Sequence, residues 1–447
     1  MEKLFGTDGV RGRANRYPMT PEVALALGQA IAFHFARKQG FGRIVIGKDT
    51  RRSSYMFEYA LSAGISSMGS IAVLTGPLPT PGIAFLTTAM RADAGVVISA
   101  SHNGFSDNGI KFFDRDGFKL PDEIESQMQD FVFQAVDDSI RPTGADIGRA
   151  VRIDDAVGRY AEFLKSTFPR SLTLKGLKVV VDCAHGAAYH VAPLVLSEMD
   201  AEVVAINHDP NGVNINEKCG ALHPEELCKK VKECNADLGI ALDGDADRLI
   251  LCDAKGRIIN GDRVLAILAM ERKSESRLYK DTVVGTIMSN MGLESYLHDQ
   301  KINFVRTAVG DRYIVEEMRN KGYTVGGEPS GHLIMMDLST TGDGLLAALQ
   351  VLACMIKKSL PLEDLVNDML VFPQKIKNIS VKKQRDIQTD KVIQDELHQI
   401  EKDLGKGRVV IRYSGTEPLL RVMVEGESDD KVNQCIDRIS ECLQTHL

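Results

Sequence analysis

Short apolar runs alternate with amphipathic helical segments through most of this chain, and this alternation limits the folds that it can adopt. One helix is predicted to begin after Thr20, because a threonine side chain caps a helix N-terminus and Pro21 fits the first turn. Apolar residues then recur at helical spacing until Gly40, a residue typical of helix ends. The runs that predict strands are 44–46, 71–74, 96–99, 179–182, 203–206, 238–242, 282–286 and 323–325. Continuous apolar strands between helices indicate parallel or mixed sheets covered on both faces.

The pattern changes after Phe372-Pro373, which predicts a boundary. Beyond it we expect strands at 376–381, 409–413 and 419–424, and helices at 391–403 and from Asp429 onward. The chain has 447 residues, which is too long for one ordinary core. We therefore predict an α/β fold of three similar α/β domains with mixed sheets plus a smaller C-terminal α+β domain. The predicted domains are 1–150, 151–255, 256–368 and 369–447.

Composition excludes several classes of function. The formal net charge is -7 and the pI is about 5.9, so no broad basic surface is expected and nucleic acid is not a predicted partner. The N-terminal residues lack the apolar stretch of a signal peptide, and no run approaches the roughly 18 apolar residues that span a bilayer. The eight cysteines form no Cys-x-x-Cys pair. These features predict a cytoplasmic protein with reduced thiols and no membrane partner.

The first loop whose residues could take part in catalysis is Val97–Gly104, where an apolar strand is followed by small polar residues. Ligands of α/β sheets gather at the carboxyl ends of strands, and Ser101 followed by His102 could supply a nucleophile there. The alternative is a polar turn, which this loop taken alone favours. The loop is not the Gly-x-Ser-x-Gly elbow of α/β-hydrolases.

The second loop carries three carboxylates, Asp243, Asp245 and Asp247, directly after an apolar strand. They converge only if the backbone curls, and if they do, their mutual repulsion favours a bound cation. An all-oxygen ligand set suits Mg²⁺. An EF-hand fits poorly, because Arg248 stands where that motif needs glycine and Ala254 where it needs glutamate. The alternative is a solvated acidic turn, and the apolar strand before it favours the metal site.

Two further loops suit a phosphorylated sugar. In the Gly-rich stretch Gly326–His332, Glu328 and Ser330 offer a carboxylate and a hydroxyl that could bind vicinal sugar hydroxyls. In the fourth loop, hydroxyl and backbone groups between two arginines are the parts of a phosphate site. Its residues are Arg412, Ser414, Gly415, Thr416 and Arg421. Each loop taken alone is also compatible with a plain turn.

Cationic side chains that lie near glycines also suit the binding of a phosphorylated substrate. Gly6–Gly12 contains Arg11, Gly47–Arg51 contains Lys48, and Lys111 and Arg312 also lie near glycines. Each is a solvated charge if taken singly. Together the four loops fall one in each predicted domain, which indicates a central cleft where four domains meet.

The four loops resemble those of the α-D-phosphohexomutase superfamily, in the same order along the whole chain. The resemblance implies that Ser101 is a phosphoserine, and that Ser101 through its phosphate binds Mg²⁺ together with Asp243, Asp245 and Asp247. Arg11, His102 and Lys111 match positions around the phosphoserine and would act in catalysis. Arg248, Glu328, Ser330, Arg412, Ser414, Gly415, Thr416 and Arg421 would bind substrate.

Further stretches resemble the amino-sugar branch of the superfamily more than its phosphomannomutases. These are Phe5–Gly12, Asn211–Gly220, Val309–Tyr313 and Thr340–Gly344. Three residues depart from the family pattern. Gly104 stands in place of a usual proline, Pro329 in place of a frequent glutamine, and Ala308 in place of a frequent lysine.

The resemblance implies that phospho-Ser101 passes its phosphoryl group to glucosamine 6-phosphate, that a 1,6-bisphosphate forms and turns round, and that glucosamine 1-phosphate is released. Mg²⁺ and a glucosamine or glucose 1,6-bisphosphate activator are the implied cofactors, and a small-molecule sugar phosphate is the implied partner. The sequence leaves a homodimer open. The alternatives are another hexose-phosphate mutase of the superfamily, a Mg²⁺-dependent phosphatase with Asp243 as nucleophile and Asp245 as acid, and a non-catalytic sugar-phosphate sensor.

Overall fold

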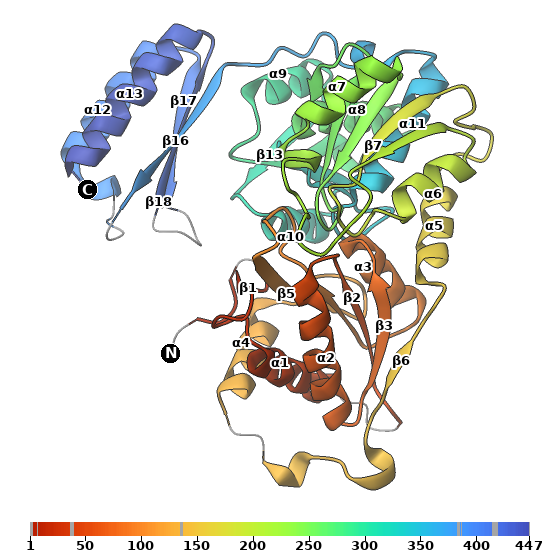
Figure 1. Cartoon of the computed structure of the whole chain (residues 1–447). Coiled ribbons are helices and arrows are strands. Elements are labelled where there is room, and N and C mark those ends of the chain that lie inside the picture. The colour runs from red at the N-terminus through yellow and green to blue at the C-terminus, as the bar shows by residue number, and fades with distance from the viewer. Residues whose placement is uncertain are drawn as a thin grey trace.

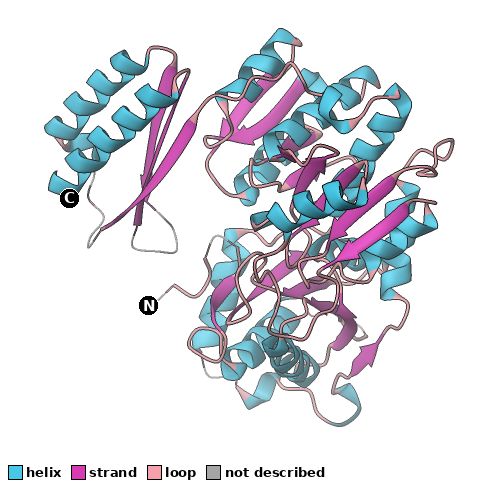
Figure 2. Ribbon diagram, turned by 45° about the horizontal axis from the view of Figure 1, so that its top comes forward, coloured by secondary structure: helices cyan, strands magenta, loops and turns pink. Residues whose placement is uncertain are grey.

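Four β-sheets follow one another along the chain, each with its own helices (Figure 1). The computed structural model describes residues 3–6, 8–35, 40–134, 137–381, 385, 387–413 and 419–446. Each sheet and its helices form a unit, and the units are numbered in chain order. Figure 2 shows helices packed beside the strands of each unit, with loops joining them.

The first unit is a mixed six-stranded sheet with strand order β1-β5-β4-β2-β3-β6. Its strands are β1 (Val10–Arg13), β2 (Arg43–Lys48), β3 (Ile71–Pro77), β4 (Ala94–Ile98), β5 (Asp107–Asp114) and β6 (Ala150–Arg152). Its helices are α1 (Pro21–His34), α2 (Arg52–Ser67), α3 (Thr80–Ala89) and α4 (Asp122–Phe133). Apolar side chains of α1, α2 and α4 pack on one face of the sheet and those of α3 pack on the other. The sheet is therefore covered on both faces, as its apolar strands predict.

Helix α1 begins as predicted. The Thr20 side chain accepts a hydrogen bond from Val23 N at 3.4 Å, and Pro21 is the first helical residue. The helix ends at His34, where Phe35 N donates to Ile31 O, and so stops short of the predicted end at Gly40.

The second and third units share much of their core with the first. The strands of the second are β7 (Lys178–Asp182), β8 (Glu202–Ile206), β9 (Leu238–Leu242), β10 (Leu249–Asp253) and β11 (Ile258–Ile259). Those of the third are β12 (Thr282–Thr286), β13 (Asn303–Thr307), β14 (Val325–Gly327) and β15 (Leu333–Met335). Their helices are α5 (Ala156–Ser166), α6 (Val191–Glu198), α7 (Glu225–Cys234), α8 (Gly261–Ser274), α9 (Met291–Asp299), α10 (Asp311–Lys321) and α11 (Gly344–Lys358). One continuous apolar cluster, which includes Val45, Val181 and Val283, runs through all three units. Burial of this shared surface holds the three units together.

The fourth unit has a core of its own. Its three antiparallel strands are β16 (Gln374–Ser380), β17 (Gly407–Tyr413) and β18 (Leu419–Gly426). Helices α12 (Lys391–Leu404) and α13 (Asp429–His446) cover one face of this sheet, at the upper left of Figure 1. Arg408 donates to Ile287 O at 2.9 Å and to Ser289 O at 2.6 Å, and Met291 N donates to Glu425 Oε1 at 2.8 Å. Polar contacts therefore attach one end of this sheet to the third unit.

The three α/β units with mixed sheets and the smaller C-terminal unit confirm the predicted fold class. The predicted domain boundaries stay predictions. The structure places β6 in the first sheet through its parallel pairing with β3, and β11 in the second sheet through its pairing with β10.

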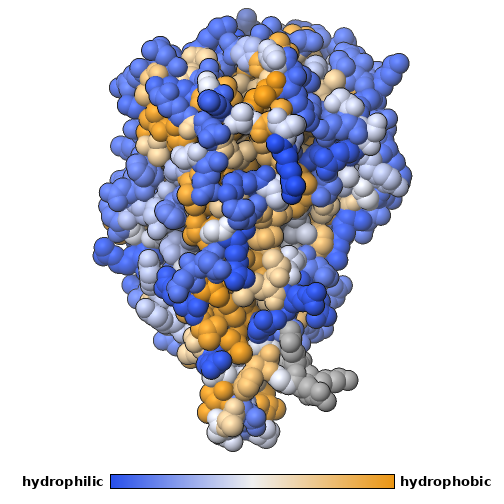
Figure 3. Space-filling model, turned by 90° about the vertical axis from the view of Figure 1, so that its right-hand side faces the viewer, coloured by the Kyte–Doolittle hydropathy of each residue, from blue (hydrophilic) through white to orange (hydrophobic). Residues whose placement is uncertain are grey.

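Among the described helices, none combines the length and the hydrophobicity that crossing a membrane needs. The side of the molecule in Figure 3 is hydrophilic over most of its area, with apolar side chains in a stripe down its middle.

Candidate active site

Ser101 lies just beyond the end of β4, in a tight loop of residues 99–103 that we call the serine loop. Its backbone has a φ of 50°, in the left-handed region that non-glycine residues seldom adopt. The Ser101 hydroxyl is buried and donates to Asp243 Oδ2 at 2.6 Å, and it lies 3.3 Å from His102 Nδ1. Burial, together with Arg248 and Arg11, lowers the pKa of His102 to about 3. A buried hydroxyl is thus aimed at a carboxylate of another unit, beside a neutral imidazole.

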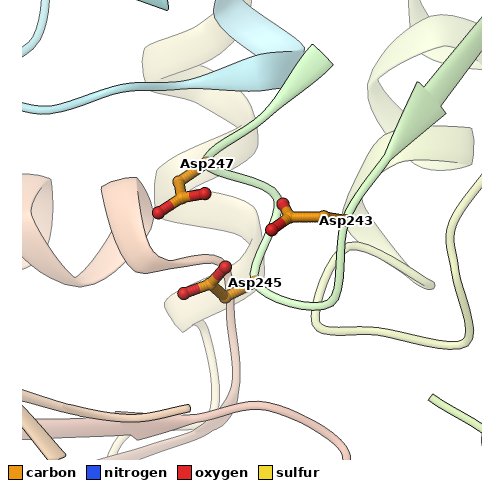
Figure 4. Close-up of side chains that lie close together, drawn as sticks. All are labelled: Asp243, Asp245 and Asp247. Atoms are coloured by element: carbon orange, nitrogen blue, oxygen red, sulfur yellow. The ribbon is translucent and has the colours of Figure 1, made fainter. Parts of the chain in front are cut away.

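The three aspartates converge, as Figure 4 shows, in the turn between β9 and β10. Ala246 has a φ of 56° and donates from its backbone N to Asp243 O at 3.0 Å, so the chain curls back on itself here. One oxygen from each carboxylate lies within 4.8 Å of the others, and all three residues are buried. The backbone therefore curls as the sequence analysis requires if the three carboxylates are to form a metal site.

The chemistry of the three aspartates fits a divalent cation. Within the described part of the chain, Asp245 Oδ1 and Asp247 Oδ1 are buried without a hydrogen-bond partner. Burial and the charges of Asp247 and Asp245 raise the pKa of Asp243 to about 8. Buried carboxylate oxygens that lack donors and repel each other are the ligands a hard cation such as Mg²⁺ satisfies.

Cations from the first unit line the same site. Lys111 Nζ donates to Asp245 Oδ2 at 3.0 Å and lies 3.6 Å from Asp247 Oδ2 and 3.3 Å from Asp8 Oδ2. Burial opposes the charge on Lys111, but the carboxylates of Asp245, Asp8 and Asp247 outweigh it and hold the pKa well above its usual value. Arg11 forms an ion pair with Asp8. Lys111 and Arg11 are therefore held as cations beside the aspartates.

The third unit brings the stretch Gly326–His332, which we call the sugar loop, against the turn of residues 243–248 between β9 and β10, which we call the metal turn. Arg248 and His332 form an isolated antiparallel bridge, and Leu249 N donates to Gly331 O at 2.9 Å. Gly331 has a φ of 91°, and a Cβ there would lie 2.1 Å from Leu249 O, so only glycine permits this approach. Glu328 and Ser330 follow in the same loop, where Ser330 Oγ donates to Glu328 Oε2 at 3.2 Å.

The fourth unit contributes two arginines. Arg412 of β17 and Arg421 of β18 are cross-strand partners. Like charges placed opposite one another destabilise a sheet unless an anion lies between them. Burial lowers the pKa of Arg412, the charge of Arg421 lowers it further, and Glu328 opposes both. Glu328 therefore interacts electrostatically with Arg412, which links the sugar loop to the fourth unit.

The structure therefore brings eight of the predicted site residues together. Ser101, His102, Lys111, Arg11, the three aspartates and Arg248 form one connected set of contacts. Ser414, Gly415 and Thr416 lie outside the described residues. Arg312, proposed only as a further cation, pairs instead with Asp122 and with Glu125 of α4.

Four residues at this site were not singled out from the sequence. Thr80 Oγ1 donates to Asp245 Oδ2 at 2.7 Å, and Asp8 pairs with Lys111. His332 is buried, with Nδ1 3.7 Å from Asp247 Oδ2 and Nε2 3.4 Å from Asp311 Oδ2. Asp8, His332 and Asp311 lie inside motifs that the sequence did single out, whereas no motif marks Thr80.

Gly104, the first departure from the family pattern, is exposed and lies just outside the serine loop. A Cβ there would meet nothing within 4 Å, and its φ is not positive. We expect Gly104→Ala to stabilise the protein by about 0.4–1 kcal/mol, because alanine restricts the unfolded chain without strain in the folded one. Urea denaturation of the variant and the wild type would measure this. A loss of stability would contradict the expectation.

The chain matches four family models in order. They are described as phosphoglucomutase/phosphomannomutase alpha/beta/alpha domain I over residues 2–137, domain II over 158–256, domain III over 260–371, and the C-terminal domain over 376–441. Among similar proteins, a phosphoglucosamine mutase of Geobacter sp. (strain M21) is 55% identical over 100% of this chain and 99% of the relative. One from Citrifermentans bemidjiense is 56% identical over 97% of this chain and 95% of the relative.

Solved structures share the fold. A phosphoglucomutase/phosphomannomutase family protein from Burkholderia thailandensis has a TM-score of 0.81 at 24% identity, over 99% of this chain and 97% of that one. The N-acetylphosphoglucosamine mutase of Aspergillus fumigatus, solved in complex with GlcNAc-6P and magnesium, has a TM-score of 0.68 at 16% identity, over 99% of this chain and 95% of that one.

Proposed function

The chain belongs to the phosphoglucomutase/phosphomannomutase family, and from this premise we propose that it interconverts glucosamine 6-phosphate and glucosamine 1-phosphate. One observation carries the proposal. In a chain that is 55% identical over its whole length to a phosphoglucosamine mutase, the Ser101 hydroxyl donates to a buried aspartate of a potential metal site. Supply of amino-sugar precursors for cell-wall synthesis is the cellular role that goes with this reaction.

In the proposed cycle, phospho-Ser101 loses its phosphoryl group to the free hydroxyl of the sugar phosphate. The Ser101 Oγ–P bond breaks, a P–O bond to the sugar forms, and the proton of the sugar hydroxyl ends on Ser101 Oγ, which becomes a free hydroxyl again. The resulting 1,6-bisphosphate turns round and returns its other phosphoryl group to Ser101. A mutase that works in this way needs a bisphosphate activator to restore the phosphoserine whenever it is lost.

The residues have separate parts in this proposal. Asp243, Asp245 and Asp247 hold Mg²⁺, which when bound offsets negative charge on the transferring group. Lys111 and Arg11 act as cations beside that group. His102, whose Nδ1 lies 3.3 Å from Ser101 Oγ, is a hydrogen-bonding neighbour of the phosphate carrier.

Substrate binding is assigned to the two remaining units. Glu328 and Ser330 bind sugar hydroxyls, and Arg248 lies beside them. Arg412 and Arg421 bind the phosphate that is not transferred, together with Ser414, Gly415 and Thr416. The repulsion between Arg412 and Arg421 supports this assignment, because a phosphate between them would relieve it.

The competing phosphatase mechanism needs Asp243 as a nucleophile. Both of its oxygens already accept hydrogen bonds, Oδ2 from Ser101 Oγ at 2.6 Å and Oδ1 from Arg248 N at 3.2 Å. This favours Ser101 over Asp243 as the residue that carries phosphate.

The test is to compare kcat/KM for the 6-phosphates of glucosamine, glucose and mannose, with glucose 1,6-bisphosphate present. We expect glucosamine 6-phosphate to lead by at least about tenfold, since discrimination at the 2-position depends on polar contacts. A higher value for glucose or mannose would assign the chain to another activity of the same family. Release of inorganic phosphate without isomerisation would support the phosphatase mechanism instead.

The proposal includes the cytoplasmic location and leaves the homodimer as a prediction. Sedimentation of the purified protein would decide the oligomeric state.

A further inference from the structure

The proposed function leaves Asn211–Gly220 of the second unit without a role, although this loop contacts the first unit in two places. Gly212 O accepts a hydrogen bond from Arg52 N at 2.9 Å, at the start of α2. The Asn216 side chain reaches the serine loop. The loop therefore connects the first unit, which carries Ser101, to the second unit, which carries the three aspartates.

Asn216 binds the two carbonyls that determine the course of the serine loop. Its Nδ2 donates to Ser101 O at 2.8 Å and to Asn103 O at 2.9 Å. Arg51 approaches the same carbonyls from the first unit, with Nη2 3.2 Å from Ser101 O and 2.5 Å from Asn103 O. Each carbonyl can accept two hydrogen bonds, so each is satisfied by one donor from each unit.

These donors act on a strained backbone. The left-handed conformation of Ser101 is unfavourable for a non-glycine residue and persists only where its surroundings enforce it. Two donors fix the direction of Ser101 O, and this direction is coupled to the φ of 50° that turns the hydroxyl toward Asp243. Arg51 is itself buried and paired with Asp49, so one of the two donors is rigid.

The metal turn is shaped around the same contact. A Cβ on Gly244 would lie 2.6 Å from Ser101 O and 2.8 Å from Asn216 Nδ2. The glycine between Asp243 and Asp245 thus allows the bonded pair of Ser101 O and Asn216 to pack against the aspartates. Asn216 is fixed in turn by its backbone, where its N donates to Ala184 O at 2.9 Å and its φ is 58°, a conformation asparagine tolerates.

We propose that Asn216 is a positioning residue that holds Ser101 in its left-handed conformation against the three aspartates. The second unit then supplies both the metal ligands and a donor that sets the geometry of the phosphate carrier. This inference rests on the proposed function.

The test compares Asn216→Gly with Asn216→Asp. Glycine removes the donor without strain at positive φ, and aspartate keeps the shape but places an oxygen opposite two carbonyl oxygens. We expect Asn216→Gly to lower kcat by about 10- to 100-fold, because one hydrogen bond is lost at each carbonyl. The KM for glucosamine 6-phosphate should stay within about twofold, since the side-chain amide of Asn216 donates its hydrogen bonds to the serine loop and not to the substrate. Asn216→Asp should lower kcat at least as far.

A second readout does not depend on activity. Amide hydrogen exchange in peptides covering residues 99–103 should be at least about tenfold faster in Asn216→Gly than in the wild type. Glu217→Ala, an exposed neighbour in the same loop, serves as the control and should leave both kcat and exchange unchanged. A kcat within about twofold of wild type together with unchanged exchange in Asn216→Gly would overturn the inference. If the wild type fails to isomerise glucosamine phosphate, the proposed function fails, and exchange in the serine loop alone then decides the role of Asn216.

Discussion

Replacing Ser101 with alanine is expected to lower the rate of isomerisation by more than about 1,000-fold, because the alanine side chain has no oxygen to carry the phosphoryl group. The fold should survive. The hydroxyl makes one strong hydrogen bond, to Asp243, and its loss should cost about 1–3 kcal/mol in a large cooperative core. Steady-state kinetics with the bisphosphate activator measures the rate, and thermal unfolding confirms the fold.

The matched control is Ser106→Ala, an exposed serine close by in the chain, which should keep full activity. Intact-mass spectrometry adds an independent readout. After incubation with glucose 1,6-bisphosphate, the wild type and Ser106→Ala should gain one phosphoryl group and Ser101→Ala none. Activity in Ser101→Ala near that of the wild type would mean that another residue carries the phosphate or that no covalent carrier exists.

The sequence predicts the bounds of a strand well where those bounds depend on the strand's own residues. The apolar run at 238–242 is strand β9, with the bounds that the pattern gives. The predicted strand at 323–325 is shifted, since β14 covers Val325–Gly327. The position of β14 depends on pairing with β12 and β15, and such register comes from distant partners.

The same distinction holds for the site. The three aspartates lie at alternate positions of one short segment, so the sequence alone shows that they converge only if the backbone curls at the small residues between them. Thr80 and Asp245 lie 165 positions apart, and Lys119 and Asp311 lie 192 apart, so their contacts exist only once the units pack together. His332 lies inside the Gly-rich stretch Gly326–His332, yet its burial between Asp247 and Asp311 depends on the close approach at Gly331.

The second large effect is expected from Asp243→Asn, because this substitution should weaken Mg²⁺ binding without weakening the fold. In the absence of Mg²⁺ the three buried carboxylates cannot all ionise without repulsion, which raises the pKa of Asp243 to about 8, and a neutral amide of the same shape removes the cost of ionising it. The metal-free variant should therefore be as stable as the wild type or more stable. Mg²⁺ at 100 times its dissociation constant should stabilise the wild type by about 2.7 kcal/mol, and the variant by much less at the same concentration.

Activity should change in the opposite direction from metal-free stability. Asp243→Asn is expected to lose more than about 100-fold in kcat, because the site has one ligand charge fewer and Ser101 loses an ionisable partner. Removing Mg²⁺ from the wild type with a chelator should give a comparable loss that added Mg²⁺ restores. Glu233→Gln, which removes an exposed carboxylate on α7, should behave as wild type in both assays. If Asp243→Asn destabilised the metal-free protein by several kcal/mol while Mg²⁺ still stabilised it as in the wild type, Asp243 would be a structural residue. The cation would then have to bind elsewhere, because opposite changes in stability and activity are expected when Asp243 contributes to a repulsion that the metal relieves.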